Sequence, residues 1–204
     1  MEYQYDVFLS YNRKFPHGQW VNEIFYPLFK SYLDEALNSD VKIFKDSQEI
    51  QSGNDWGLKI RKALITSKIM VSIFSPSYFR SEWCMKEFST IYHRQKELGF
   101  LTLLNPTGLI IPVKIFDGEH FPDYANSLQM LNCIDFNRVG PGVMQTNLYI
   151  DLQGKLQDWI YDVAEALKQA PPFNDNWMTD EWVEIPFSKL NISATCPNIN
   201  PPIL

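Results

Sequence analysis

Apolar residues along this chain follow two alternating patterns: short continuous runs, and longer stretches in which they recur every three or four residues. The short runs are rich in β-branched and aromatic residues, which is typical of buried strands. They predict five strands, at residues 5–11, 41–44, 69–74, 109–116 and 133–136. Pro112 has no backbone N–H to donate, so we expect it to restrict the pairing of the fourth strand.

The stretches with helical spacing lie between these runs and after them. They predict four helices, at residues 19–37, 55–67, 82–98 and 152–167. Pro27 interrupts the first helix, so we expect a kink or a new helical start there. Pro171 and Pro172 stop the last helix, and the chain beyond them is rich in Asn and Pro with scattered aromatic residues. The sequence therefore predicts a domain at 1–170 and a C-terminal extension at 171–204, which packs on the domain or binds a partner.

The alternation of strands and helices predicts an α/β fold, a doubly wound parallel sheet with helices on both faces. Five strands favour the flavodoxin-like strand order over a full Rossmann fold. In such sheets, ligands bind outside the carboxyl ends of the strands, where the strand order reverses. We therefore expect the functional site in the loops that follow Tyr11, Phe44 and Phe74.

Composition narrows the class of protein further. With 204 residues, of which 45% are hydrophobic and 21% charged, the chain is suited to one globular domain. Its formal net charge of -6 argues against nucleic acid as a partner. Three cysteines without paired spacing favour a reducing compartment. Neither a signal peptide nor an apolar stretch of about 20 residues is visible, so we expect a cytoplasmic protein with no membrane partner.

Several well-known catalytic motifs are absent from the sequence. It contains no glycine-rich dinucleotide fingerprint after the first strand, no phosphate-binding loop with Gly-Lys-Ser or Gly-Lys-Thr, and no Gly-x-Ser-x-Gly elbow. Its three histidines are isolated, and no Cys/His cluster has the spacing of metal ligands. We therefore expect neither a bound metal nor a resident cofactor.

The segment at residues 81–87, Ser-Glu-Trp-Cys-Met-Lys-Glu, is the main candidate for chemistry. Ser81 is a good N-cap for the helix that follows. Trp83 and Glu87 are four residues apart and therefore neighbours on one flank of that helix, near the predicted ligand crevice. A carboxylate beside an indole at such a crevice is a candidate reactive site. The alternative is a solvated Glu paired with Lys86 and a Trp that only packs.

Four segments in their sequence order resemble a known family. Residues 5–11, Tyr-Asp-Val-Phe-Leu-Ser-Tyr, resemble the first signature of the Toll/interleukin-1 receptor (TIR) domain family. Residues 41–46, followed by Gly53, are similar to its second strand and the loop after it. Residues 81–87 resemble the Trp-Cys-x-x-Glu element of the family's third helix, and residues 109–116 fit its fourth strand.

This resemblance implies two functional classes. Many animal TIR domains act only as adaptors, whereas others, in bacteria, plants and one animal axon-degeneration protein, cleave NAD+ and need the helix glutamate. Glu87 occupies that position, so we expect it to be catalytic, stabilising the positive charge that develops on the ribose as nicotinamide leaves. NAD+ is then a substrate, and the product is ADP-ribose or a cyclic ADP-ribose signal. A small TIR protein also resembles bacterial anti-phage effectors, with a downstream protein that senses the product.

Residues on the strand ends are the expected substrate contacts. Arg13 is a candidate for binding the diphosphate because a guanidinium contacts two phosphate oxygens, or it is simply a surface cation. Ser10 and Tyr11 either line the sugar pocket or only finish the strand. Phe44 either stacks on a flat ring or packs in the core. Asp46 begins the loop expected to cover the site.

Three other points complete the prediction. Trp83 is expected to shape the wall of the substrate pocket, beside Glu87. Cys84, near a helix N-terminus, is a candidate for a lowered pKa, although its place on the apolar stripe disfavours a nucleophilic role. Residues 15–20 and 101–108 depart from the family pattern.

Two other functions stay open. The first is a non-enzymatic module that self-associates with other TIR domains through the loop between Lys45 and Asp55. The second is a flavodoxin-type phosphoacceptor, but that class needs clustered acidic residues after the first strand, and the sequence lacks them.

Overall fold

The structure, a computed structural model, describes residues 2–45, 56–178 and 182. Five parallel strands in these residues form one sheet of order β2-β1-β3-β4-β5. The strands are β1 (Tyr5–Tyr11), β2 (Ile43–Lys45), β3 (Ser67–Phe74), β4 (Ile110–Lys114) and β5 (Leu131–Asn132). This is the flavodoxin-like order, so the α/β fold predicted from the alternating pattern is confirmed.

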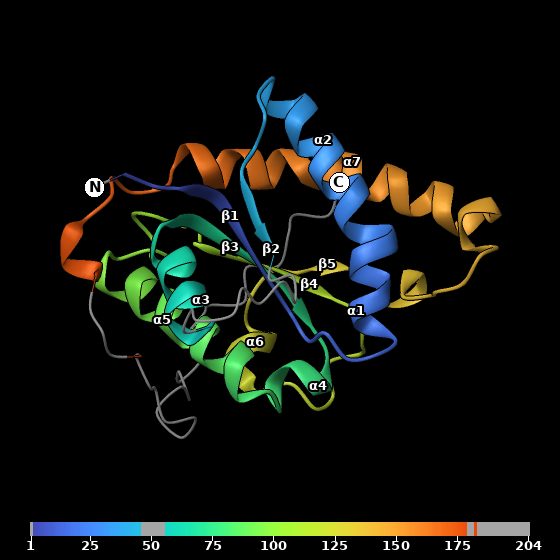
Figure 1. The fold of residues 1–204 in the computed structure, drawn as a ribbon, viewed down its shortest axis with the longest axis horizontal. Helices are drawn as coiled ribbons and strands as arrows, with labels where there is room; N and C mark the ends of the chain where they lie inside the picture. The colour runs from blue at the N-terminus through green and yellow to red at the C-terminus, as the bar shows by residue number, and fades with distance from the viewer. Residues whose placement is uncertain (1, 46–55, 179–181, 183–204) are drawn as a thin grey trace.

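Helices cover both faces of the sheet (Figure 1). One face carries a continuous helical segment and a long closing helix: α1 (His17–Trp20), the π-helical turn η1 (Val21–Phe25), α2 (Tyr26–Leu37) and α7 (Asn147–Lys168). The opposite face carries α3 (Trp56–Ile65), α4 (Pro76–Phe79), α5 (Glu82–Glu97) and α6 (Asp123–Asn126). Three 3-10 turns complete the described elements: η2 (Ile134–Phe136), η3 (Val143–Gln145) and η4 (Asp175–Trp177).

Pro27 lies in the first turn of α2, which begins at Tyr26 and continues the helical path from η1. The N–H of Tyr26 bonds to the carbonyl of Val21, five residues earlier, and Pro27 then occupies the first turn of α2. A first helical turn tolerates proline because its N–H groups have no partner within the helix. The predicted new start at Pro27 is confirmed, and the wider π turn connects it to α1.

The core lies on both faces of β3, the central strand. Five of the eight residues of this strand are apolar, and Ile69 to Phe74 are all buried. Burial on both faces removes the polar alternation seen in half-exposed strands, which explains the continuous apolar run in the sequence. On the α7 face, Phe25 and Phe29 stack on each other with ring centroids 5.4 Å apart, and both contact Trp159.

The fifth strand is shorter and earlier than the sequence predicts. β5 ends at Asn132, and the predicted strand residues after Cys133 form the 3-10 turn η2 instead. The side-chain oxygen of Asn132 accepts a hydrogen bond from the N–H of Ile134 at 3.2 Å, which turns the chain away from the sheet. The prediction of a strand at residues 133–136 is therefore wrong, because local side-chain bonding overrides its apolar pattern.

Pro112 restricts pairing on one side of β4, as predicted. The N–H of Ile115 bonds to β3, whereas the carbonyl of Lys114 accepts from Cys133 on the β5 side. The backbone groups of successive strand residues point to alternate sides, so the backbone of Pro112 faces β5 as well, and the pairing with β5 begins only at Val113.

The apolar pattern does not predict the short helices α4 and α6, nor the first five residues of α7.

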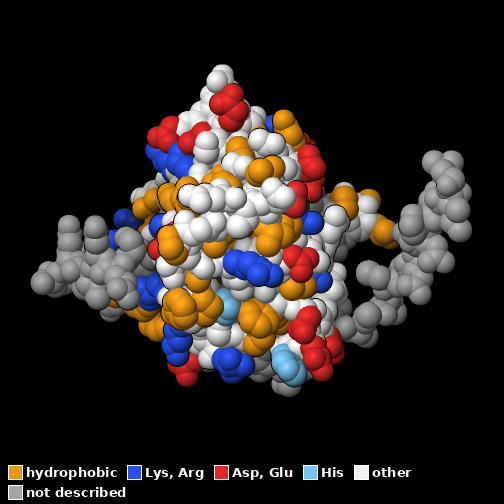
Figure 2. Space-filling view, turned by 90° about the vertical axis from the view of Figure 1, so that its right-hand side faces the viewer, with side chains coloured by type: hydrophobic (Ala, Val, Ile, Leu, Met, Phe, Trp, Pro, Cys, Tyr) orange, Lys and Arg blue, Asp and Glu red, His pale blue; other side chains and the backbone are white. Residues whose placement is uncertain are grey.

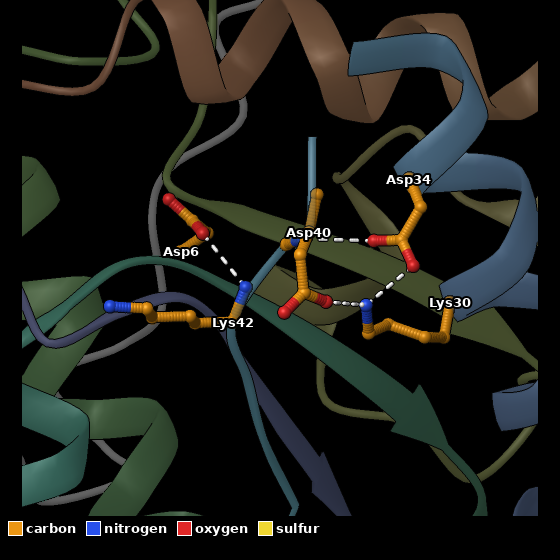
Figure 3. A network of polar contacts seen from close by, with 6 residues as sticks. Asp6, Lys30, Asp34, Asp40 and Lys42 are labelled. Carbon is orange, nitrogen blue, oxygen red and sulfur yellow. Dashed lines mark hydrogen bonds and ion pairs between the residues drawn. The ribbon is translucent and has the colours of Figure 1, made fainter. Parts of the chain in front are cut away.

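A group of charged residues holds the turn between α2 and β2 (Figure 3). Lys30 Nζ lies 2.5 Å from Asp34 Oδ2 and 2.7 Å from Asp40 Oδ1. Asp34 also accepts a hydrogen bond from the N–H of Val41 at 2.8 Å, so one carboxylate ties α2 to the start of the next segment. These bonds orient the chain as it enters the sheet edge beside β1.

The described part of the C-terminal extension packs beside the N-terminus (Figure 1). Tyr3 donates a hydrogen bond to the carbonyl of Pro171 at 2.8 Å and contacts the rings of Phe173 and Trp177. Trp177 also covers the guanidinium of Arg94, with Cζ 4.4 Å from the ring centroid. Residues 171–177 therefore lie on the domain surface.

Two surface properties complete the description. On the face shown in Figure 2, the described basic and acidic side chains are interspersed with apolar ones. No helix in the described ranges combines the length and the apolar character that a membrane crossing requires.

Candidate functional site

A cavity of about 170 Å³ opens at the carboxyl end of β1, between the loop after that strand and the first turns of α3 and α5. This is the end of the sheet at which the sequence predicts the ligand site, since β1 and β3 are the strands where the order reverses. Its walls are formed by Leu9, Tyr11, Asn12, Arg13, Lys14, Trp56, Ser81, Trp83, Cys84 and Glu87.

The first two turns of α5 bring two of these side chains to the cavity. Ser81 caps the helix, because its hydroxyl accepts a hydrogen bond from the N–H of Cys84. Trp83 and Glu87, one helical turn apart, both lie on the cavity wall. Trp83 keeps 37% of its surface exposed at the rim, whereas Glu87 is only 6% exposed, deeper in the wall.

Glu87 is bonded to β1 by a short hydrogen bond. The hydroxyl of Ser10 donates to Glu87 Oε2 at 2.6 Å, across 77 residues of sequence. Ser10 Oγ lies a further 2.9 Å from the hydroxyl of Tyr78 in α4. Tyr78 is fully buried, and burial together with the nearby Cys84 and Glu87 holds the pKa of its phenol well above the usual value.

Aromatic rings and a guanidinium form the outer wall. Trp56 and Trp83 meet edge to face with centroids 4.5 Å apart, and the Arg13 guanidinium carbon lies 5.1 Å from the centroid of the Trp56 ring. Trp182, from the C-terminal extension, contacts Trp83 at 5.9 Å. The site thus has a buried carboxyl group, with cationic and aromatic groups at its mouth. This arrangement suits a ligand that has an anionic part and flat rings.

Cys84 does not have the lowered pKa considered from its place near a helix N-terminus. Burial and the neighbouring Glu87 carboxylate raise the pKa of its thiol to about 12. The thiol is 4% exposed, and desolvation of the thiolate outweighs the helix dipole. Cys84 is therefore a neutral wall residue, in agreement with its place on the apolar stripe of α5.

The structure brings together only some of the candidate residues. Tyr11, Arg13, Trp83 and Glu87 line the cavity. Ser10, 1% exposed, lies behind the carboxyl group and not on the cavity surface.

Phe44 is not among the residues that line the cavity. Phe44 stacks on Phe8 with ring centroids 5.2 Å apart and also contacts Tyr5, which favours the packing alternative. Asp46 and Gly53 lie outside the described residues.

Three site residues were not identified from the sequence. The apolar spacing of the helix at residues 55–67 predicts a core position for Trp56, yet its ring lies on the cavity wall. Tyr78 belongs to α4, whose start, Ser75 followed by Pro76, is a recognisable N-cap signal in the sequence. Asn12 donates to the carbonyl of Ser77 at 2.8 Å, a contact across 65 residues with no local signal.

Metal binding has no visible basis in the described residues. They contain no group of three or more His, Cys, Asp or Glu side chains placed to hold a metal ion.

Comparison with known proteins gives consistent matches. A family model described as TIR domain matches residues 7–146. The chain is 25% identical over 119 residues to the probable 2′ cyclic ADP-D-ribose synthase BdTIR of Brachypodium distachyon, covering 58% of this chain and 50% of that protein. It is 31% identical over 101 residues to disease resistance protein RPS6 of Arabidopsis thaliana, covering 50% of this chain and 8% of that protein. It thus spans half or less of the length of these relatives.

Solved structures with a similar fold are also found. The TIR domain of the Toll-related receptor TRR-2 from Hydra magnipapillata is 19% identical with a TM-score of 0.44, covering 76% of this chain and 99% of that one. The TIR domains of the activated Roq1 resistosome, which recognises the effector XopQ, are 18% identical with a TM-score of 0.42, covering 81% of this chain and 96% of that one.

Proposed function

Because this chain belongs to the TIR domain family, we propose that it cleaves the nicotinamide–ribose bond of NAD+ with Glu87 as the catalytic residue. The observation that carries the proposal is the buried Glu87 carboxyl group on the wall of the cavity at the carboxyl end of β1. The name of one relative, a probable 2′ cyclic ADP-D-ribose synthase, supports the same substrate class.

The chemistry needs only one carboxylate. Nicotinamide in NAD+ already carries a positive charge on its ring nitrogen, so it departs without protonation by an acid. Its departure leaves an oxocarbenium-like ribose, and an adjacent carboxylate lowers the energy of that cation. Water that attacks the sugar gives ADP-ribose, whereas attack by a group of the same molecule gives a cyclic product.

Other cavity residues suit the remaining parts of NAD+. The Arg13 guanidinium is exposed at the mouth and matches the geometry of a diphosphate. The indoles of Trp56 and Trp83 offer ring edges and faces to a nicotinamide or adenine ring. Tyr11 lines the cavity, and its hydroxyl donates to Asn22 at 3.2 Å.

The cavity is too small for the whole substrate. Sites for drug-sized ligands occupy about 300–1,000 Å³, and this cavity measures about 170 Å³. We propose that the ribose and nicotinamide occupy it, while a second copy of the chain completes the surface around the adenosine half. Self-association would then be part of the catalytic cycle, and activity would rise more steeply than the protein concentration.

Nicotinamide release from NAD+ is the direct test, followed by chromatography over a range of protein concentrations, with and without a crowding agent. Glu87→Gln keeps the size of the side chain but removes its charge, so we expect kcat to fall by about 100-fold or more. Glu82→Gln is the matched control, because Glu82 lies exposed in the first turn of the same helix. Separation of the products distinguishes linear from cyclic ADP-ribose.

Two results would reject this function. Release that persists in Glu87→Gln would remove the assigned catalytic residue. No release by the unmodified protein at any concentration would favour a non-enzymatic assembly module, the alternative left open by the sequence.

The biological setting is a further part of the proposal. Curated relatives include plant disease-resistance proteins, among them TMV resistance protein N of Nicotiana glutinosa, which is 31% identical over 90 residues and covers 44% of this chain and 7% of that protein. We propose a role in immune signalling in the cytoplasm, with a downstream protein that detects the nucleotide product. Anti-phage defence stays a prediction, checked by expression in a phage-challenged bacterium.

A further inference from the structure

The proposed function requires Glu87 to be charged, and burial by itself disfavours a charged carboxylate. The side chain is 6% exposed, and its neighbours Cys84 and Tyr78 are buried and neutral. Burial in such a place favours the protonated carboxylic acid unless hydrogen-bond donors stabilise the carboxylate. A protonated Glu87 would offer the developing ribose cation far less stabilisation. The hydrogen-bond donors to Glu87 therefore determine whether it carries the charge that the proposed reaction requires.

Counting protons gives the direction of the hydrogen bonds behind Glu87. An ionised carboxylate only accepts, so the Ser10 hydroxyl, 2.6 Å from Oε2, must donate its single proton to Glu87. The same hydroxyl oxygen lies 2.9 Å from the Tyr78 hydroxyl. Because the proton of Ser10 is already used, Tyr78 must be the donor in that second bond. The chain thus runs from Tyr78 through Ser10 to Glu87.

Tyr78 is held firmly at the start of this chain. It is completely buried, and its N–H bonds to the hydroxyl of Ser75, the N-cap of α4. Its ring packs against those of Phe74 and Phe79, with centroids 5.3 and 5.4 Å away. Since the pKa of its phenol is well above the usual value, Tyr78 keeps its proton at neutral pH.

We propose that Tyr78 is a positioning residue of the Glu87 site, which acts through Ser10 to hold the carboxylate charged and in a fixed orientation at the cavity. Ser10 then serves the catalytic group directly, in place of the sugar contact expected from sequence. The inference rests on the proposed function for its catalytic consequence. Its physical content, the charge state of Glu87, is measurable without turnover.

The other titratable and charged groups of the cavity enter the pH behaviour as well. Among the described residues, those that line it beside Glu87 are Tyr11 of β1, Arg13 and Lys14 of the loop after it, and Cys84 of α5. The two cations favour the carboxylate at a distance, and burial raises the pKa of the Cys84 thiol to about 12. Variants at Tyr78 and Ser10 leave all four in place, so a change in the titration of Glu87 reports the hydrogen-bond chain.

The first experiment titrates Glu87 by NMR in protein labelled at the glutamate carboxyl carbons, with its signal assigned from Glu87→Gln. Tyr78→Phe keeps the ring and removes the donor, so we expect the pKa of Glu87 to rise by about 0.5–1 pH unit, and Ser10→Ala to raise it by about 1–2. Tyr92→Phe is the matched control, since Tyr92 is a buried tyrosine of α5 whose ring stacks on Phe88.

The second experiment measures nicotinamide release by the same variants. We expect kcat to fall about 3- to 10-fold in Tyr78→Phe and about 10- to 100-fold in Ser10→Ala, with KM nearly unchanged. The acidic limb of the kcat profile should move to higher pH in both. Ser10→Thr keeps a hydroxyl and should recover most of the activity, which a purely structural role of Ser10 would not predict. Tyr92→Phe should match the unmodified protein.

The outcomes separate the two proposals. An unchanged pKa of Glu87 in folded Tyr78→Phe and Ser10→Ala overturns the positioning role, even if Glu87→Gln abolishes NAD+ cleavage. If the unmodified protein cleaves no NAD+ but the pKa of Glu87 rises in both variants, the proposed function fails and the hydrogen-bond chain stands. A variant whose near-UV circular dichroism departs from the unmodified protein is replaced by Ser10→Cys, which removes most of the donor strength with little change in volume.

Discussion

Gly18 provides a sharp test of how the loop that carries Arg13 is positioned. An added Cβ at Gly18 would lie 2.2 Å from the carbonyl oxygen of Arg13, 2.6 Å from its carbonyl carbon and 2.9 Å from its Cα. All three are backbone atoms, so no change of side-chain rotamer can relieve the overlap. Gly18→Ala must therefore separate α1 from the loop by about 1 Å to restore ordinary contact distances.

The expected cost follows from that displacement. Overpacking of this kind destabilises proteins by about 1–3 kcal/mol, which lowers Tm by roughly 3–10 °C for a chain of this size. Gly18 is buried, and its N–H bonds to the carbonyl of Lys14 at 3.0 Å, so the strain falls on a bonded turn. The displaced Arg13 should also lower kcat/KM for NAD+ by roughly tenfold or more if the proposed function holds.

Gly154→Ala is the matched control for the same chemical change. Gly154 is exposed within α7, and an added Cβ there meets nothing within 4 Å. Alanine has the higher helix propensity, so this variant should gain about 0.5–1 kcal/mol. Differential scanning calorimetry of the two variants gives the comparison. A Tm of Gly18→Ala at or above that of the unmodified protein would show that the close approach to Arg13 is not a constraint.

Three other perturbations test separate parts of the structure. Trp177→Ala removes the ring over Arg94 and should lower the free energy of unfolding by about 1–3 kcal/mol, measured as a lower urea midpoint. An unchanged midpoint would mean that the extension does not stabilise the domain. Because burial raises the pKa of Cys84 to about 12, peptide mapping should find it unmodified by iodoacetamide at pH 8 in the native protein and modified in urea. Lys30 lowers the pKa of Asp40, so this pair contributes stability that is present above the unfolded pKa of Asp40 and is lost as the pH falls through its lower folded value. Asp40→Asn should therefore reduce the loss of stability between about pH 5 and pH 2. An identical acid dependence of the variant and the unmodified protein would exclude the pair as a contributor.

The sequence alone determined the order of elements and the local framework of the site. The apolar run at residues 69–74 predicts a central buried strand, and Ser81 predicts the start of the helix that carries Trp83 and Glu87. These predictions succeed because they depend on contacts within one element. Hydrogen bonding along a helix and burial on both faces of a strand leave periods that a single chain displays.

Only the tertiary structure decided what surrounds Glu87. Ser10 donates to it across 77 residues of sequence, and the Trp56 ring reaches Trp83 from a different helix. Gly18 shows the same limit, since its requirement for glycine arises from the backbone of Arg13 and not from its own helix. Such contacts depend on how the crossovers bring strands and helices together, and periodicity within one segment carries no record of the neighbour that another segment supplies.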